Sequence, residues 1–239
     1  LLVVAVPQRV TPFDVLVTAD GRPLDELPAG AVIGTSSIRR VTQLQKLRPD
    51  LVTAPLRGNI DTRLGRVTSG HYAGIILAAA GLERVGLADR GAELLQPPKF
   101  WPAIAQGALA LQVRADDTAV QAALRLIDHA PSHRAIVAER ACLSSLAGGC
   151  LAPIGGFAAE KEGELELTAC VLDNTPSEVR RIDATAAIAV DAAAEEAKQA
   201  AADLGRRVAE QLRAAGADDM LTRMREQQEV APPPLPDLD

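Results

Sequence analysis

The sequence predicts an α/β fold followed by a small α+β domain, and two observations carry that prediction. The first is the alternation of short apolar, strand-like runs with amphipathic helical runs through the first half of the chain. This alternation is typical of β-α-β units and a parallel sheet. The second is a change of character near Ser132, after which a helix, an alternating strand pattern and a long amphipathic helix follow one another.

The elements of the α/β part follow from local pattern. We expect strands in AVIGTSS, DLVTAPLRG and YAGIILAAAG. We expect one helix in SIRRVTQLQKLRP, which must end before Pro49, and another in NIDTRLGRVTSG, which stops at Gly70. A Pro-rich connection, QPPKFWPAIAQGALAL, leads to a helix in DDTAVQAALRLIDH and then to a break at APSH.

The second part has its own signals. The run SHRAIVAERACLSSLAGGC predicts a helix that ends at the glycines, and ELELTACVL predicts a half-buried strand after a hairpin turn at EKEG. The last helix is predicted near Asp191 to Ala214. Its apolar stripe consists of Ala197, Ala201, Leu204, Val208 and Leu212. The Pro-rich tail, residues 229–239, is predicted to be disordered.

Composition excludes several classes of protein. Of 239 residues 48% are apolar but only 2% are aromatic, so the core must be aliphatic, and a net charge of -6 argues against general nucleic-acid binding. No apolar run reaches the roughly 18 residues that a membrane span needs. The cysteines Cys142, Cys150 and Cys170 have no C-x-x-C spacing, so we expect no disulfide framework and a cytoplasmic location. The chain opens inside an apolar run without Met or signal peptide, and we interpret it as truncated at its N-terminus.

A set of arginines is the strongest indication of a binding site. Guanidinium groups bind carboxylates in bidentate fashion, and ligands of parallel sheets lie at the carboxyl ends of the strands. The arginines expected at these ends are Arg39, Arg40, Arg57, Arg63 and Arg84. Arg39 and Arg40 are neighbours at a helix start, so they could hold two separate anions, with Ser36 and Ser37 as caps or further ligands. The alternative for each arginine is a surface ion pair.

Cys150 is the second candidate. Gly148 and Gly149 remove side chains in front of its thiol, which could therefore be displayed on a loop, although a buried structural cysteine or a spectator at a helix end has the same spacing. Cys142 and Cys170 lie on helix and strand patterns and are interpreted as core residues. His129 and His133 are separated by Pro131, which argues against a helical zinc pair.

Five motifs in this order resemble the porphobilinogen deaminase (hydroxymethylbilane synthase) family: GTSSIRR, LRGNIDTRL, IILAAAGLERVGL, PAIAQGALALQVR and AERACLSSLAGGCLAPIGGFA. The resemblance covers almost the whole chain. It implies two lobes like those of type-II periplasmic binding proteins and a third, α+β domain. Residues 8–107 would form the second lobe, 129–228 the C-terminal domain, and 1–7 with 108–128 a remnant of the first lobe.

The resemblance also implies a function. The family joins four porphobilinogen molecules into hydroxymethylbilane with release of ammonia, on a dipyrromethane cofactor bound by a thioether, here to Cys150. By match, Ser37, Arg39 and Arg40 would contact this cofactor, and Arg57, Arg63 and Arg84 the substrate carboxylates. Gln106 and Gly107 match the return from the second lobe to the first.

Further expectations follow from the same resemblance. The family's catalytic aspartate has no counterpart in this chain, which is therefore expected to be inactive alone, and neither Asp61 nor Asp89 can be assigned its role. A monomer is expected, without metal, nucleic acid or membrane. The alternative is a non-catalytic anion-binding module of periplasmic-binding-protein type.

Overall fold

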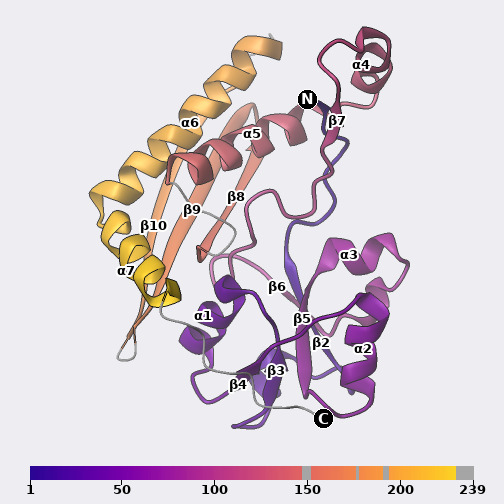
Figure 1. Ribbon diagram of the computed structural model, residues 1–239, viewed down its shortest axis with the longest axis vertical. Coiled ribbons are helices and arrows are strands. Elements are labelled where there is room, and N and C mark those ends of the chain that lie inside the picture. The colour runs from indigo at the N-terminus through magenta and orange to yellow at the C-terminus, as the bar shows by residue number, and fades with distance from the viewer. Residues whose placement is uncertain (147–151, 176–177, 191–193, 230–239) are drawn as a thin grey trace.

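The computed structural model describes residues 1–146, 152–175, 178–190 and 194–229, and its strands form three sheets (Figure 1). A five-stranded sheet with the order β4-β3-β5-β2-β6 belongs to the first half of the chain. A three-stranded sheet with the order β10-β9-β8 belongs to the second half. β1, which precedes the five-stranded sheet in sequence, and β7, which follows it, form a small third sheet. The predicted order, an α/β part followed by an α+β part, is confirmed.

The five-stranded sheet is mixed and not purely parallel. Its elements are β2 (Asp14–Thr18), β3 (Val32–Gly34), α1 (Ile38–Leu47), β4 (Val52–Ala54), α2 (Ile60–Thr68), β5 (Gly74–Ala78), α3 (Ala79–Arg84) and β6 (Glu93–Leu95), with short 3-10 turns at Leu24–Glu26 and Ala88–Arg90. The three predicted strands β3, β4 and β5 are parallel. β2 runs antiparallel to both β5 and β6, because it carries the chain into this lobe and β6 precedes its exit.

Local signals fix the helix ends of this lobe. α1 stops at Leu47, two residues before Pro49, as the restriction on residues preceding proline predicts. α2 begins after Asn59, whose side-chain oxygen accepts a hydrogen bond from the backbone N–H of Thr62 at 2.9 Å. The chain then turns at Gly70, where φ is +75°. Each helix starts after a short loop that follows the carboxyl end of its strand, α1 after β3 and α2 after β4.

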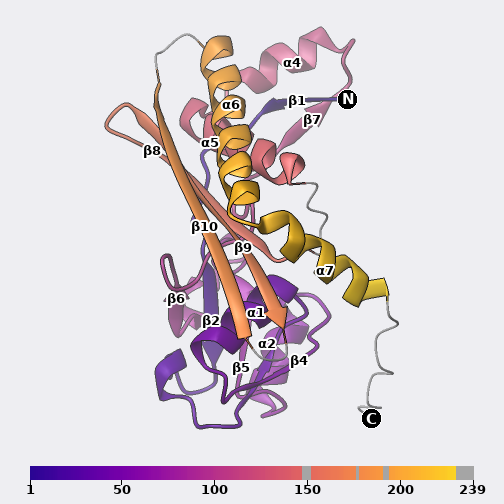
Figure 2. The same ribbon diagram turned by 90° about the vertical axis from the view of Figure 1, so that its left-hand side faces the viewer.

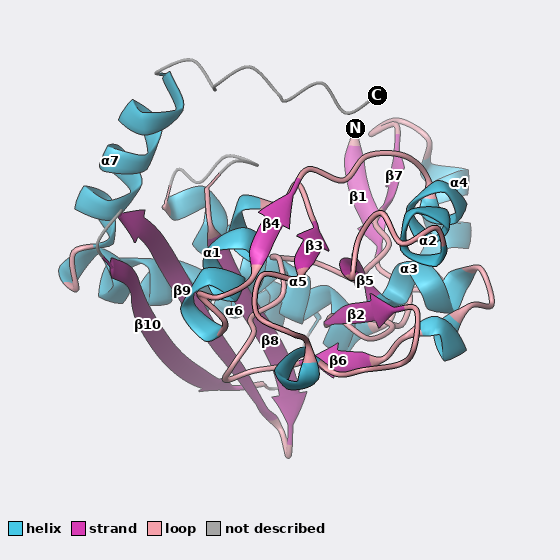
Figure 3. Cartoon of the chain, turned by 90° about the horizontal axis from the view of Figure 1, so that it is seen from below, coloured by secondary structure: helices cyan, strands magenta, loops and turns pink. Residues whose placement is uncertain are grey.

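Side-chain alternation along β5 divides the core of this lobe into two layers. Ile75 and Leu77 pack with Leu64 of α2 and Leu82 of α3, whereas Ile76 packs on the other face of the sheet with residues that include Leu44 of α1. Figure 3 shows the same arrangement from below, with α2 and α3 on one side and α1 toward the C-terminal sheet.

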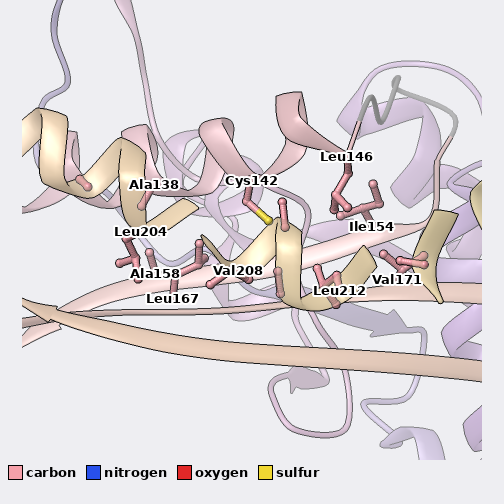
Figure 4. Close-up of a cluster of buried hydrophobic side chains, with 14 of the residues drawn as sticks. Ala138, Cys142, Leu146, Ile154, Ala158, Leu167, Val171, Leu204, Val208 and Leu212 are labelled. Carbon is pink, nitrogen blue, oxygen red and sulfur yellow. The ribbon is translucent and has the colours of Figure 1, made fainter. Parts of the chain in front are cut away.

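The C-terminal domain packs α5, α6 and α7 against its three-stranded sheet around one apolar core (Figure 2). Its elements are α5 (Ala130–Ser145), β8 (Ile154–Lys161), β9 (Glu164–Thr175), β10 (Glu178–Ala189), α6 (Ala194–Ala214) and α7 (Ala217–Glu229). The stripe predicted for α6 is buried, and Figure 4 shows Leu204, Val208 and Leu212 in one cluster with Ala138, Cys142 and Leu146 of α5. The hairpin predicted at EKEG is confirmed, with β8 and β9 joined at Glu162 and Gly163.

One sequence expectation for this domain needs correction, and two of its elements were not expected. The APSH segment is the first turn of α5 and not a break: His129 accepts a hydrogen bond from the N–H of Ser132, and Pro131 lies in the first turn, where its missing N–H is not needed. β10 and α7 were not predicted.

α5 and α6 approach so closely that a Cβ atom on Gly205 would lie 2.1 Å from the carbonyl oxygen of Ala138.

The remaining elements form a small unit of their own. β1 (Leu2–Ala5) pairs antiparallel with β7 (Leu111–Val113), and α4 (Thr118–Arg125) contacts both strands. Several large apolar side chains of this unit and its flanks are exposed: Leu1, Leu2, Val3, Leu109, Val120, Leu126 and Ile127. Among the described residues, no helix combines the length and the apolar character needed to cross a bilayer.

Candidate functional site

Arg39 lies in the first turn of α1, directly after β3, and it is buried. Its Nη1 donates hydrogen bonds to Oδ2 of Asp14 at 2.7 Å and to the carbonyl oxygen of Trp101 at 2.5 Å. Its Nη2 lies 3.5 Å from Oε1 of Gln106. Arg39 therefore joins the α/β lobe to the connection that leaves it.

Arg40 reaches the same carboxylate from the next position of the helix. Its Nε and Nη2 donate to Oδ1 of Asp14 at 3.0 and 2.7 Å, and its Nη1 donates to the carbonyl oxygen of Ile76 at 2.7 Å. The sequence suggested that Arg39 and Arg40 could hold two separate anions. The structure instead brings both guanidinium groups onto one carboxylate, which leaves the group of three side chains with a net positive charge.

Asp14 is the residue at the centre of this arrangement, and the sequence analysis missed it. It begins β2, its side chain is 0% exposed, and Oδ1 also accepts a hydrogen bond from Nε2 of Gln106 at 3.0 Å. Burial alone would raise the pKa of Asp14, but the charges and hydrogen bonds of Arg39 and Arg40 hold that pKa below its ordinary value. A charged residue at the head of the apolar run FDVLV was the available signal.

The charges close to Arg40 are more positive than negative. Burial lowers the pKa of the Arg40 guanidinium, and the nearby cations Arg39 and Arg63 lower it further, against the opposing attraction of Asp14. An added carboxylate would relieve this repulsion. The charges of Arg39, Arg40 and Arg63 thus exceed that of Asp14, which would attract an anionic ligand.

The other predicted arginines make fewer contacts. Arg63 is half-buried on α2, and its Nε donates to the carbonyl oxygen of Gly58 at 2.8 Å. Arg57 is exposed in the loop after β4. Arg84 ends α3, so it follows a short helix and not a strand directly, and its Nη2 donates to the carbonyl oxygen of Gly107 at 2.7 Å.

The two serines before α1 have different roles. Oγ of Ser36 both donates to the carbonyl oxygen of Leu56 and accepts from its N–H, so Ser36 ties the loop after β3 to the loop after β4. Ser37 occupies the N-cap position of α1, where its side chain makes no capping hydrogen bond with the described residues. Of the two hydroxyl groups, that of Ser37 is the one free of such a structural task.

The segment 105–107 connects this site to the C-terminal domain. Ala105 has φ of +61° and Gly107 of +84°, and a Cβ on Gly107 would lie 2.5 Å from the carbonyl oxygen of Thr11. A positive φ is strained for alanine and persists only where the surroundings hold it. Here they do, because Nε of Arg9 donates to the carbonyl oxygen of Gln106 at 2.9 Å.

Glu139 of α5 completes this connection. Its carboxylate, 0% exposed, accepts hydrogen bonds from Nη1 and Nη2 of Arg9 at 2.6 and 3.2 Å, from the N–H of Ala105 at 2.6 Å and from the N–H of Ala158 at 2.8 Å. Burial raises the pKa of this carboxyl, although Arg9 and the backbone donors act in the opposite direction. A continuous set of hydrogen bonds thus runs from Arg40 through Asp14 and Gln106 to the C-terminal domain.

Cys150, the predicted tether, lies outside the described residues, as do the glycines before it. After this gap the chain resumes at Ala152, and the carbonyl oxygen of Pro153 accepts a hydrogen bond from the N–H of Leu172 at 3.0 Å. Burial raises the pKa of Cys142 and of Cys170 to about 12, so neither forms a thiolate near neutral pH.

The histidines have local partners. Nδ1 of His133 lies 2.8 Å from Oδ1 of Asp128, and Nδ1 of His129 lies 2.9 Å from Oγ of Ser132. In the part of the chain that the structure describes, no group of three or more His, Cys, Asp or Glu side chains could hold a metal ion. Asp61 and Asp89, to which no role could be assigned from the sequence, are both exposed.

Comparison with known proteins agrees with these features. The family model described as "Porphobilinogen deaminase, dipyromethane cofactor binding domain" matches residues 1–122, and "Porphobilinogen deaminase, C-terminal domain" matches residues 133–214. A porphobilinogen deaminase of Brevibacillus brevis is 44% identical over 225 residues, which cover 94% of this chain and 69% of the relative.

Two further relatives with the same name extend this comparison. The protein of Thermus thermophilus is 43% identical over 94% of this chain and 72% of its own length, and that of Corynebacterium diphtheriae is 44% identical over 80% and 65%. The chain thus spans about two thirds of the length of these relatives. It belongs to the porphobilinogen deaminase family, the transferases of tetrapyrrole biosynthesis that carry a dipyrromethane cofactor.

Proposed function

We propose that this chain serves the head-to-tail joining of four porphobilinogen molecules into hydroxymethylbilane, on a dipyrromethane cofactor bound by a thioether to Cys150, and that the chain alone is inactive because none of its described residues is assigned the proton transfers. In each addition a carbon–carbon bond forms between two pyrrole units and ammonia leaves. The observation that carries the proposal is the pairing of Arg39 and Arg40 with one buried carboxylate, with the charge of Arg63 close enough to act on Arg40, in a chain of this family.

The donor set fits the cofactor. Every porphobilinogen unit carries an acetate and a propionate group, so the dipyrromethane and the growing product are polyanions, and guanidinium groups are the side chains best suited to bind carboxylates. Ser37, Arg39 and Arg40 serve the cofactor in this proposal. Arg57, Arg63 and Arg84 serve the arriving substrate, and the exposure of Arg57 and Arg84 supports that assignment.

The residues of this chain bind and orient the reacting units. The cofactor, when bound, supplies the terminal pyrrole to which the next unit is added. Arg40 and Arg63 neutralise carboxylates beside it, which favours a product whose negative charge grows with every addition. The proton transfers that accompany loss of ammonia are assigned to none of the described residues.

We further propose the domain division 8–107 and 129–228, with residues 1–7 and 108–128 belonging to another lobe. The separate β1–β7 sheet and the exposed apolar side chains around it support this division, because such side chains are normally covered in a folded lobe. We place the protein in the cytoplasm as a monomer.

The competing function is an anion-binding module without catalysis. Such a module would use the arginines in the same way but would have no use for a thiol at position 150. The substitution Cys150→Ser therefore separates the two functions, since it abolishes tetrapyrrole attachment in the first and changes nothing in the second.

The test is the intact mass of the protein after incubation with porphobilinogen or with preformed hydroxymethylbilane. We expect a covalent gain of two pyrrole units or more, absent in Cys150→Ser and retained in Cys142→Ser, which changes a buried cysteine of the core. A gain that survives in Cys150→Ser would contradict the assigned tether. A chain that remains unmodified while it binds porphobilinogen reversibly would favour the binding module.

A further inference from the structure

We propose that Asp14 is a positioning residue of this site, whose carboxylate fixes Arg39 and Arg40 so that Arg40 presents its remaining N–H groups to ligand carboxylates. The proposal rests on the proposed function for the identity of the ligand. Its geometric part, the fixing of Arg40, stands on contacts within the chain.

Arg39 and Arg40 differ in how many of their N–H groups are used within the chain. Both N–H groups of Arg39 Nη1 are used, by Asp14 and by the carbonyl oxygen of Trp101, and its side chain is only 5% exposed. The Arg40 side chain is 12% exposed. Its Nη1 and Nη2 each donate one hydrogen bond to the described residues, which leaves a second N–H on each for a ligand.

The carboxylate of Asp14 is held in place by the sheet and by Gln106. The backbone of Asp14 is paired on both sides in the sheet, opposite Ala78 of β5 and Leu95 of β6. Its Oδ1 is held from a third direction by Nε2 of Gln106. A carboxylate held in this way cannot follow a ligand, and since it is fully buried it acts only through the arginines.

Removal of Asp14 would change carboxylate binding in opposite directions under the two possible roles of this residue. The charges of Arg39, Arg40 and Asp14 sum to one positive charge, so neutralising Asp14 would raise the sum to two. If Asp14 only balanced charge, its removal would strengthen the binding of a carboxylate ligand. If Asp14 positions Arg40, its removal weakens that binding, because the guanidinium no longer meets the ligand in a fixed orientation.

The first experiment measures the position of Arg40 without any ligand. Phenylglyoxal modifies accessible guanidinium groups, and peptide mass mapping gives the rate at each arginine. In Asp14→Asn we expect the rate at Arg40 to rise by about fivefold or more, because three charge-assisted hydrogen bonds are weakened. Arg48, which pairs with the half-exposed Asp50, serves as an internal control for unfolding and should not change.

The matched control variant is Asp50→Asn, which removes the same charge from a surface ion pair and should leave the Arg40 rate unaltered. An unchanged Arg40 rate in Asp14→Asn would overturn the proposal. If Asp14→Asn does not fold, the double variant Asp14→Asn/Arg39→Gln removes the buried pair together and keeps the net charge. The same rise at Arg40 is then expected, and its absence is equally decisive.

The second experiment measures porphobilinogen affinity by calorimetry, with Cys150→Ser as background so that nothing attaches covalently. We expect Asp14→Asn to weaken binding by about tenfold or more, the order expected for a displaced charge partner. Equal or tighter binding would show that Asp14 only balances charge. If the background protein binds no porphobilinogen, a carboxylate-binding role of Arg40 is contradicted, whereas the modification rates still decide whether Asp14 fixes Arg40; the proposed function itself is decided by the mass test of Cys150→Ser.

Discussion

The carboxylate of Glu139 offers a sharp test of how the C-terminal domain is joined to the rest of the chain. Each oxygen of this buried group accepts one hydrogen bond from Arg9 and one from a backbone N–H: Oε1 from Ala158 and Oε2 from Ala105. Glu139→Gln keeps the shape but replaces one oxygen by an NH2 group. Whichever way the amide is oriented, that group meets one N–H of Arg9 and one backbone N–H.

The magnitude follows from this count. Two hydrogen bonds are lost and two buried donors remain unsatisfied, at about 1–3 kcal/mol each, while the Arg9 charge loses its counter-ion. We expect a loss of about 3–5 kcal/mol in the free energy of unfolding. Urea denaturation followed by far-ultraviolet circular dichroism measures it, because the C-terminal domain holds the long helices.

Glu160→Gln is the matched control. Glu160 uses Oε2 alone to accept both hydrogen bonds from Arg134, so a glutamine can keep them by turning its carbonyl oxygen toward the arginine. The expected loss is about 1 kcal/mol or less. A Glu139→Gln protein within about 1 kcal/mol of the unaltered chain would refute the reasoning, since it would mean that the four donors are not held against the carboxylate.

Three further outcomes are expected. Gly205→Ala should lower the free energy of unfolding by about 2 kcal/mol, because the new methyl group forces α5 and α6 apart. The control Gly65→Ala in α2 places its methyl group in open space and should raise the free energy of unfolding by up to about 1 kcal/mol. Equal effects of the two variants in urea denaturation would contradict this expectation. A thiol reagent at about pH 8 should leave Cys142 and Cys170 unmodified in the folded protein, since a pKa of about 12 leaves roughly one thiolate in ten thousand, and mass mapping would detect any labelling. Folding lowers the pKa of Asp14, so its carboxylate stabilises the folded protein above the unfolded pKa, and this contribution is lost as the pH falls below about 4. Asp14→Asn should therefore flatten the decline in unfolding free energy between about pH 5 and 2. An unchanged slope would count against the lowered pKa.

The elements that could be predicted from the sequence are those whose signal is local. α1 and α2 end at a proline and a glycine, and the stripe of α6 repeats with helical spacing, so both signals can be read without knowing the partner. β10 lacks such a signal. Its run of small and charged residues becomes a strand only because β9 offers twelve residues of antiparallel pairing.

Arg39 and Arg40 could be named as candidates from the sequence, but their shared partner Asp14 could not. Helix starts after β3 and β4 identify the arginines, since ligands of α/β sheets lie at strand ends. That Arg39 and Arg40 share Asp14 depends on β2 lying beside β5, an antiparallel pairing between segments about sixty residues apart that local periodicity does not contain. The role of Glu139 was hidden for the same reason, because its partners come from three distant segments.

The position of Trp101 gives this protein an optical consequence. It is the single tryptophan of the chain, its ring packs against Cys170 and Leu172 of β9, and the Arg181 guanidinium lies 5.6 Å from the ring centroid. Its carbonyl oxygen is the one that Arg39 holds. Indole emission responds to the polarity and charge around the ring, so the native fluorescence of this protein is a label-free reporter of the junction between the arginine cluster and the C-terminal sheet, and a titration with ligand can be followed there without adding a dye.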